Sequence, residues 1–358
     1  MKNLIKAVVF TLIFLGTLTR VSYILRPYSG SASRKNLCGF YAEENNTIDM
    51  VWVGSSAVFA FWEPIEFWKS SGITSYNFAT GTMPPQAVKY CVKEVLKTQS
   101  PELFVIDLRL FANGEYKDKS DELPIMDQEV PIRNVTDNFK YSLNRLQMIH
   151  GCVPTSLYDA LPFYLDIIKY HTEWQCFIDP QSLAFMNNSS HDSTKGFKLV
   201  DAVKPQKLTD WSYVTERKPV SERTEEILRS LLEYCRSEEL QVLFVVNPYV
   251  QDREYKEYHN YLADIIAEYN YDVINTNDYY EEIGVNPLTD YYDTSHMNIL
   301  GADKYTKFMG NYILEHHYLE ASEKNEELKE RWDADYESWS VEVKKLKASI
   351  QAKIDGMD

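Results

Sequence analysis

The sequence predicts an α/β fold built on a five-stranded parallel sheet. Short runs of β-branched and other apolar residues recur without a polar alternation, which is typical of strands buried on both faces. Segments with helical spacing of apolar residues stand between these runs, and such alternation favours parallel pairing. At 358 residues, with 44% hydrophobic and 14% aromatic residues, the chain is long enough for one large domain with additional segments.

Five segments carry the strand pattern. The first, IDMVWVGSS at 48–56, ends in small residues, and ITSYNFATG at 73–81 repeats that plan. The other three are LFVIDLRLF at 103–111, QVLFVVNPYV at 241–250 and YDVINTND at 271–278. Five such strands with helices on both faces make a compact doubly wound domain, flavodoxin-like in plan.

Amphipathic helices are predicted between and after the strands. In 86–99, Val88, Cys91, Val92 and Leu96 can share one helical face. Three later segments show the same kind of spacing: 225–239, 257–270 and 302–318. The last of them closes the predicted core.

One long region interrupts the alternation. Residues 112–220 contain no convincing buried strand, but they include helical patterns at 137–151 and 156–174. Polar stretches such as NNSSHDSTKG separate these patterns from the rest of the domain. We interpret the region as a helical insertion after the third strand, which forms a cap or lid over the strand ends.

Residues 321–358 form a distinct charged tail. Its apolar residues recur at helical spacing: Leu328, Trp332, Trp339, Val343, Leu346 and Ile350. This pattern predicts an amphipathic helix with one apolar seam. We favour packing of that seam on the chain's own domain, and the alternative is docking of a partner or self-association.

Residues 1–27 are predicted to form a membrane anchor. A continuous apolar run covers 7–18, and 4–25 reaches the roughly 20 residues that a membrane helix needs, if Lys6 and Arg20 extend to the interfaces. A cleaved signal peptide is the alternative, although its small-residue site lies well past the apolar run.

The orientation follows from the charges at the amino terminus. Lys2 and Lys6 favour a cytoplasmic amino terminus, so that residues 28–320 would form an extracytoplasmic α/β domain. Arg20 and Arg26 on the other side weaken this argument.

Composition excludes several classes of function. The net charge of −16 makes nucleic acid and anionic membrane surfaces poor partners, because phosphate binding needs clustered positive charge. No CxxC, HExxH, GxGxxG, Walker or EF-hand pattern is present, so the sequence indicates no metal, nucleotide or other cofactor. We interpret the five cysteines mainly as small core residues, and one disulfide stays open.

Groups suited to acyl transfer follow several strand ends. Ser55 and Ser56 follow the first strand, Gly81 follows the second, and Asp293 and His296 precede the last helix. Ligands of open α/β sheets bind beyond the carboxyl ends of the strands. A serine nucleophile needs an imidazole to take its proton, and the imidazole needs a carboxylate to fix its tautomer. An aspartate three residues before a histidine can supply both groups on one loop.

At this point the chain shows a resemblance. The segments VWVGSS, YNFATG and YDTSHMNILGADKYT resemble blocks I, II and V of the SGNH/GDSL hydrolase superfamily. The resemblance covers about 48–110 and 228–314, and it leaves out the anchor, the insertion and the tail. It implies a three-layer domain with the catalytic serine after the first strand.

The resemblance also implies roles for individual residues. Ser56 would be the nucleophile, His296 the general base, and Asp293 the carboxylate that orients the base. Ser55 is the competing assignment for the nucleophile. The backbone N–H groups of Ser56 and Gly81 would line the oxyanion hole.

The third block of the family departs from its usual form. The family has Gly-x-Asn-Asp after the third strand, whose asparagine donates to the oxyanion, whereas this chain reads DLRLFANGEY. Either the oxyanion hole has two donors, or Arg109 or Asn113 supplies a third or contacts the substrate. An ion pair with a nearby acid such as Asp107 is the alternative role for Arg109.

An amino-terminal anchor with a long insertion resembles a subset of extracytoplasmic SGNH proteins, which serve D-alanylation of teichoic acids and O-acetylation of envelope polysaccharides. This implies a serine esterase or O-acyltransferase that passes an acetyl or D-alanyl group through an ester on Ser56 to a cell-envelope glycopolymer. A membrane-bound O-acyltransferase would be its partner. The alternative is a catalytically degenerate scaffold subunit of an envelope complex, which the missing asparagine and the tail favour. A secreted lipase is a third, less supported possibility.

Other side chains have two interpretations each. Trp62 and Trp68, just beyond the serine, are expected to be core residues, with a sugar-stacking wall as the alternative. His171, in the insertion, is a candidate contributor to the acceptor site.

Overall fold

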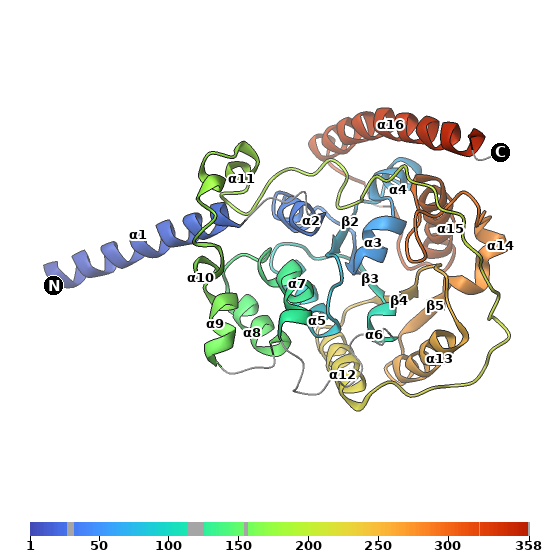
Figure 1. The fold of residues 1–358 in the computed structure, drawn as a ribbon, viewed down its shortest axis with the longest axis horizontal. Coiled ribbons are helices and arrows are strands. Elements are labelled where there is room, and N and C mark those ends of the chain that lie inside the picture. Colours follow the sequence, from blue (N-terminus) through green and yellow to red (C-terminus); the bar gives the residue numbers. More distant parts are fainter. Residues whose placement is uncertain (27–31, 113–124, 154–156, 322, 357–358) are drawn as a thin grey trace.

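The structure is a computed structural model that describes residues 1–26, 32–112, 125–153, 157–321 and 323–356. Its centre is a five-stranded, all-parallel sheet with strand order β2-β1-β3-β4-β5 (Figure 1). The strands are β1 (Met50–Gly54), β2 (Ser75–Ala79), β3 (Leu103–Asp107), β4 (Val242–Val246) and β5 (Asp272–Asn275). The predicted α/β class, with a flavodoxin-like parallel sheet, is confirmed.

Helices cover both faces of the sheet, which makes three layers (Figure 1). Val51 and Val53 of β1 belong to one apolar cluster, while Trp52 between them belongs to the other. Alternate residues of a strand point to opposite faces, so this division follows from the strand geometry. One face carries α5 (Pro85–Val95), α12 (Glu222–Ser237) and α13 (Arg253–Ala267); the other carries α3 (Ser56–Phe61), α4 (Pro64–Ser71) and α15 (Ile299–Glu315).

The ends of the central strands lie level with one another. Gly54 at the end of β1 is paired with Ala79 at the end of β2, and Val53 is paired with Ile106 of β3. The helix α2 (Ala32–Phe40) contacts β2 and covers the outer edge of the sheet. Groups that follow these strands therefore emerge at one common rim.

The insertion is helical, as predicted, and no strand occurs in its described residues. It begins with α6 (Arg109–Ala112) and continues with α7 (Ile125–Thr136), α8 (Leu143–Cys152), α9 (Leu157–Tyr164), α10 (Asp166–Tyr170), the 3₁₀ helix η2 (Trp174–Phe177) and α11 (Pro180–Ala184). α8 packs on α5, and α9 packs on α8.

An irregular segment then carries the chain back across the domain. The Lys198 N–H donates to the Phe59 carbonyl at 2.8 Å, and the Lys204 N–H donates to the Tyr291 carbonyl at 2.8 Å. Both acceptors neighbour the predicted catalytic segments. This extended chain is thus a part of the insertion that pairs with the segments around Ser56 and Asp293, whereas α8 packs against α5 and α9 packs against α8.

The tail forms the long helix α16 (Glu326–Asp355), which contacts α4 and α15. Trp332 is fully buried, with its ring 5.5 Å from that of Trp68, and Trp339 packs on Phe197. The buried Lys195 ammonium bridges Asp335 of α16 at 2.9 Å. The apolar seam therefore faces its own domain, the arrangement we favoured from the sequence.

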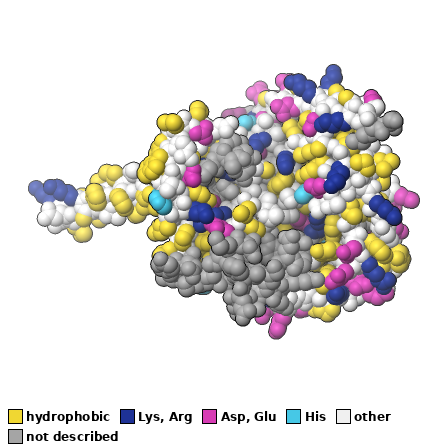
Figure 2. All heavy atoms as spheres, in the orientation of Figure 1, with side chains coloured by type: hydrophobic (Ala, Val, Ile, Leu, Met, Phe, Trp, Pro, Cys, Tyr) yellow, Lys and Arg dark blue, Asp and Glu magenta, His cyan; other side chains and the backbone are white. Residues whose placement is uncertain are grey.

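The amino-terminal helix α1 (Lys2–Leu25) projects from the globule (Figure 1). Of the helices that the structure describes, it is the one long and apolar enough to cross a membrane, a test that a signal sequence also passes. Residues 1–17 are exposed, and only the last turn is buried. Hydrophobic side chains line its exposed length (Figure 2).

The five cysteines are free and buried: Cys38, Cys91, Cys152, Cys176 and Cys235. This fits their interpretation as small core residues and leaves no disulfide in the described chain. Burial raises the pKa of several of these thiols, that of Cys38 to about 11 and those of Cys152 and Cys235 to about 12.

Candidate active site

Ser56 stands at the start of α3, directly after the first strand. The Ser55 side chain caps this helix by accepting from the Ala57 N–H at 3.5 Å, which places Ser56 at the first helical position. Gly54 makes the turn possible, because a Cβ there would lie 2.4 Å from the Cβ of Asp107 and 2.7 Å from Val58. A tight strand-to-helix turn thus presents the Ser56 hydroxyl at the rim.

The Ser56 hydroxyl meets the predicted base. Its Oγ lies 2.7 Å from Nε2 of His296, within hydrogen-bonding distance. Nδ1 of the same ring lies 2.9 Å from each carboxylate oxygen of Asp293. An ionised carboxylate can only accept, so Nδ1 carries the proton and Nε2 is free to accept from the serine. The three predicted residues therefore lie in hydrogen-bonding sequence.

The carboxylate of Asp293 is held in its ionised form. Partial burial raises its pKa, but the hydrogen bonds from the His296 ring and the Ser295 N–H outweigh burial, so the pKa lies below its usual value. The Tyr292 ring stacks on the His296 ring, with centroids 5.3 Å apart and planes 6° from parallel. The imidazole is thus fixed by the carboxylate at its edge and an aromatic ring at its face.

The residues after the histidine brace this loop. Asn298 caps α15 by accepting from the Leu300 N–H at 3.0 Å, and its amide donates to the Thr289 carbonyl at 2.7 Å. Gly301 allows the close approach of Asp290, whose carbonyl oxygen would lie 2.5 Å from a Cβ at that position. The His-x-Asn and Gly of the sequence pattern therefore have a structural role here, because they fix the loop against its helix.

Ser55 has a different partner. Its hydroxyl donates to Asp107 at 2.9 Å, whereas the hydrogen bond to His296 comes from Ser56. Burial raises the pKa of Asp107, although Arg109 and the hydrogen bonds from Ser55 and the Arg109 N–H act against it. Ser55 therefore supports the turn, and Ser56 is the serine beside the base.

Arg109 braces the histidine loop from the opposite side. Its guanidinium donates to the Ser295 carbonyl at 3.1 Å and lies over the Tyr249 ring, 3.9 Å from the centroid. Only its backbone N–H reaches the Asp107 carboxylate, at 3.1 Å, and no ion pair joins the two side chains in the described residues. Asp107, the acid named as an example for an ion pair with Arg109, is therefore not its ion-pair partner in the described residues.

One predicted oxyanion donor is already occupied. The Gly81 N–H donates to the Ser33 hydroxyl at 2.8 Å, and the Gly81 carbonyl accepts from Asn134 at 2.8 Å. α2 and α7 supply these partners because both lie against the loop after β2. The prediction that Gly81 offers a free N–H therefore differs from the structure. By contrast, the Ser56 N–H has no acceptor among the described residues.

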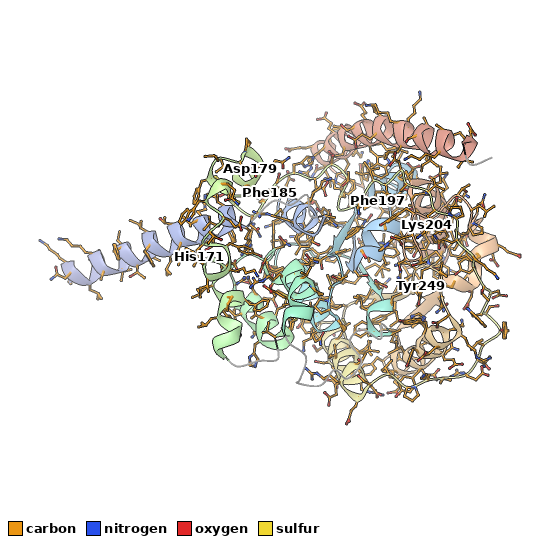
Figure 3. The ribbon with its side chains drawn as sticks, viewed as in Figure 1. His171, Asp179, Phe185, Phe197, Lys204 and Tyr249 are labelled. Atoms are coloured by element: carbon orange, nitrogen blue, oxygen red, sulfur yellow. The ribbon has the colours of Figure 1, made fainter. Side chains whose placement is uncertain are left out.

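Other predicted candidates lie away from the triad or outside the description. Asn113 lies outside the described residues. Trp62 is fully buried and Trp68 is almost so, which agrees with core packing rather than a sugar wall. His171 is exposed beside α1, whereas Tyr249 lies in the other half of the molecule, near β4 (Figure 3). His171 therefore does not join the site.

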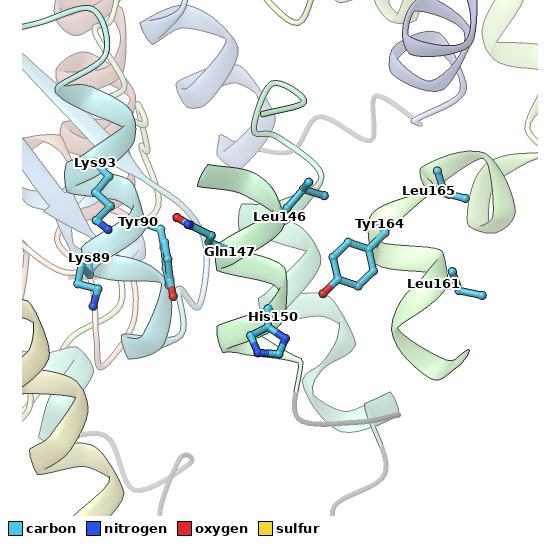
Figure 4. A pocket seen from close by; sticks show the side chains of 9 residues that line it. All are labelled: Lys89, Tyr90, Lys93, Leu146, Gln147, His150, Leu161, Tyr164 and Leu165. Atoms are coloured by element: carbon cyan, nitrogen blue, oxygen red, sulfur yellow. The ribbon is translucent and has the colours of Figure 1, made fainter. Parts of the chain in front are cut away.

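A separate open hollow of about 750 Å³ lies between α5, α8 and α9 (Figure 4). Lys89, Lys93 and His150 contribute charge or polarity to it, and Leu146 and Leu161 contribute apolar surface. None of its lining residues belongs to the Ser56–His296–Asp293 group. The hollow is therefore not a better candidate for the active site than the Ser56–His296–Asp293 group. The described residues also contain no group of histidine, cysteine and carboxylate side chains that could hold a metal ion.

Comparison with protein-family models gives no match, and comparison with curated proteins gives none either. The argument for function therefore depends on the geometry at Ser56. Sequence reasoning missed three supporting residues, namely Ser33, Tyr292 and Asn134. Tyr292 stands directly before Asp293, but no sequence spacing distinguishes a ring that stacks on a histidine from an ordinary loop tyrosine.

Proposed function

We propose that this chain is an SGNH-type serine esterase or O-acyltransferase that works through an acyl ester on Ser56. The observation that carries the proposal is the continuous chain of hydrogen bonds from Ser56 through His296 to Asp293. A structural ion-pair network would not need a serine hydroxyl at its end. The hydrogen bond of Ser56 to a histidine 240 positions away is therefore best explained by proton transfer between the two side chains.

The chemistry follows from these positions. Nε2 of His296 accepts the Ser56 proton as Oγ attacks the carbonyl carbon of an ester, and the carbonyl oxygen becomes the oxyanion of a tetrahedral intermediate. The intermediate collapses, the bond to the leaving alcohol breaks, and that alcohol takes the proton from His296. The Ser56 N–H is available to the oxyanion. A second donor to this oxyanion requires Gly81 to exchange its bond to Ser33 for one to the substrate.

The second half-reaction decides between hydrolysis and transfer. His296 takes a proton from an acceptor hydroxyl, whose oxygen attacks the acyl-Ser56 carbonyl; the proton then returns to Ser56. The acceptor is water in an esterase and a sugar hydroxyl in an acyltransferase. The Asp293 side chain is 39% exposed and that of His296 is 18% exposed, which favours a site open to a bulky acceptor such as a glycopolymer.

The proposed setting is the cell envelope. α1 would anchor the chain, with the α/β domain outside the cytoplasm, and a membrane-bound O-acyltransferase would supply acetyl or D-alanyl groups. Support for this setting comes from the length and apolar character of α1 and from the lysines at its start. No cofactor is needed for the proposed reaction.

Covalent labelling tests the nucleophile. A fluorophosphonate probe phosphonylates an activated serine, so the wild-type chain should be labelled and Ser56→Ala should not be. Ser55→Ala is the matched control, since its hydroxyl lies next in sequence but donates to Asp107. Mass spectrometry should place the adduct on Ser56. Labelling that survives Ser56→Ala would contradict the proposal.

A catalytically degenerate scaffold is the second candidate, and one observation favours it. The Gly81 N–H is held by Ser33, and the family's third-block asparagine is missing, so the oxyanion hole is incomplete as it stands. Loss of a single oxyanion donor commonly costs about 10²–10³ in rate. Absence of labelling in the wild-type chain, with intact folding, would support the scaffold.

A further inference from the structure

Exposed apolar residues gather at the end of the insertion nearest α1. Beyond α1, from residue 26 onward, thirteen large hydrophobic residues of the described chain are exposed, and six of them fall within 22 positions. These six are Leu165, Ile168, Trp174, Ile178, Leu183 and Met186, and together we call them the apolar collar. Ile178 is 83% exposed and Trp174 is 61% exposed, which is unusual for side chains of this kind.

The collar surrounds the place where α1 enters the globule. α1 contacts α10, η2 and α11, which carry three of the six collar residues and lie next to the other three. Figure 1 shows α10 and α11 on either side of the end of α1, and Figure 2 shows hydrophobic side chains along α1 and over the adjoining edge of the globule. The collar therefore lies at the base of the apolar length of α1, beyond the exposed Arg20.

A buried network fixes this junction. Nε of Arg26 donates to the Asp166 carboxylate at 2.8 Å, and Arg145 donates to the same carboxylate at 2.7 Å. The Tyr23 ring stacks on Tyr141, with centroids 5.5 Å apart. Two arginines lower the pKa of Asp166 against the effect of its burial, so this carboxylate stays charged and paired. The direction of α1 relative to the collar is thereby set.

The exposed part of α1 is too short to hold the globule away from a membrane surface. Its exposed residues 2–17 span about 24 Å at 1.5 Å per residue. The hydrocarbon core of a bilayer is about 30 Å thick. A bilayer that holds α1 must therefore extend to the globule, and the first surface it meets is the collar.

We propose that the apolar collar is a membrane-interface surface, which inserts beside α1 into the boundary between lipid headgroups and acyl chains. Trp174 stacks on Phe177, with centroids 5.9 Å apart, and such aromatic rings favour this boundary. The half-buried acids Glu173 and Asp179 lie among the apolar residues, and Lys169 is paired with Glu129. Apolar burial rather than attraction to anionic lipid drives the contact.

The collar gives the insertion a function that the chemistry at Ser56 does not require. It holds the α/β domain at a fixed tilt against the bilayer instead of leaving it on a flexible tether. The inference rests on α1 spanning a membrane and is independent of the reaction at Ser56. Failure of one proposal is therefore distinguishable from failure of the other.

Site-specific fluorescence in vesicles tests the collar. The five native cysteines are buried, so a cysteine introduced on the surface can be labelled selectively. The full chain is reconstituted in phosphatidylcholine vesicles as Ile178→Cys, with an environment-sensitive fluorophore on the new thiol. Val341→Cys, on α16 and 54% exposed, is the matched control away from α1, and Phe10→Cys reports on α1 itself.

We expect the label at Ile178 to emit at shorter wavelength and to be quenched by lipids with a nitroxide near the headgroup, at least about twofold more strongly than the label at Val341. Adding anionic phosphatidylglycerol should leave this difference unchanged. The label at Phe10, near the middle of the exposed length of α1, is measured with lipids that carry the nitroxide deep in the acyl chain. Equal headgroup-region quenching at Ile178 and Val341, with strong acyl-chain quenching at Phe10, would overturn the collar while leaving the anchor intact. Absence of acyl-chain quenching at Phe10 would overturn both.

Discussion

The hydroxyl of Ser56 and the imidazole of His296 are 240 positions apart in the sequence, yet their Oγ and Nε2 atoms lie 2.7 Å from each other. The parallel sheet accounts for this meeting. β1 lies near the centre, so the turn after it and the loop before α15 emerge at one rim. The fold thus brings the proton donor and its acceptor together without a local sequence motif.

Replacing the nucleophile should abolish ester cleavage. In Ser56→Ala we expect the kcat on an activated aryl acetate to fall by about 10⁴-fold or more, because no acyl-enzyme can form. The thermal unfolding midpoint should change little, since Ser56 is only partly buried. Release of the aryl alcohol, followed by absorbance, measures the rate. A residual rate close to that of wild type would place the nucleophile elsewhere.

Replacing the orienting carboxylate tests the tautomer argument. Asp293→Asn keeps the shape of the side chain, but its amide can donate to Nδ1 and so stabilise the wrong tautomer of His296. We expect a fall of about 10³–10⁴ in kcat with a smaller change in KM. Asp264→Asn, on α13 at an exposed ion pair with Arg217, is a suitable control and should retain activity.

The lowered pKa of Asp293 predicts a direction for stability against pH. A carboxyl whose pKa is lower in the folded state binds its proton less readily there than in the unfolded chain. Its stabilising contribution is therefore complete above the usual aspartate pKa of about 3.9 and is lost as the pH falls through the lower folded value. Chemical unfolding should show wild type and Asp293→Asn differing by a constant amount above about pH 5, with the difference shrinking below pH 4. A difference that grows on acidification contradicts the assignment.

Arg109 should act through position rather than contact with substrate. Arg109→Ala removes both the bond to the Ser295 carbonyl and the stack on Tyr249, so the histidine loop can shift relative to Ser56. Misplacement of this kind costs up to about 100-fold in kcat, with KM nearly unchanged. Arg109→Lys should rescue little, because an ammonium cannot reproduce the planar stack. Arg253→Ala, at an exposed ion pair, is the control. A large rise in KM alone would instead indicate a substrate contact.

The sequence predicted the fold well because the fold depends on local patterns. The continuous apolar runs became β1 to β5, and the spacing of Val88, Cys91 and Val92 became the buried face of α5. Apolar periodicity decides such elements, so it can be read without tertiary information. The amphipathic helix of the tail was predicted in the same way from its apolar spacing. Its packing on the chain's own domain was one of two open interpretations.

The site was partly predictable, and the limit has a physical cause. Ser56, Asp293 and His296 stand where a parallel sheet collects its functional groups, so topology alone suggested that they meet. The bond between Ser33 and Gly81, by contrast, joins a helix before the first strand to the loop after the second. Likewise, Arg109 reaches Ser295 across 186 positions. Such contacts depend on tertiary packing, and they produce no periodic pattern of residues in the sequence.

The tail should contribute to the stability of the domain rather than act as an independent module. Trp332 is fully buried between α16 and α4, and the buried ammonium of Lys195 lies 4.8 Å from its ring. Trp332→Ala leaves a cavity beside a buried charge, so we expect a loss of about 3–5 kcal/mol in the free energy of unfolding. Val341→Ala, on the exposed face of the same helix, should stay within about 0.5 kcal/mol of wild type. Denaturant unfolding compares the two variants in detergent. Equal stabilities would mean that α16 detaches easily from the domain, and its seam would then be free to bind a partner.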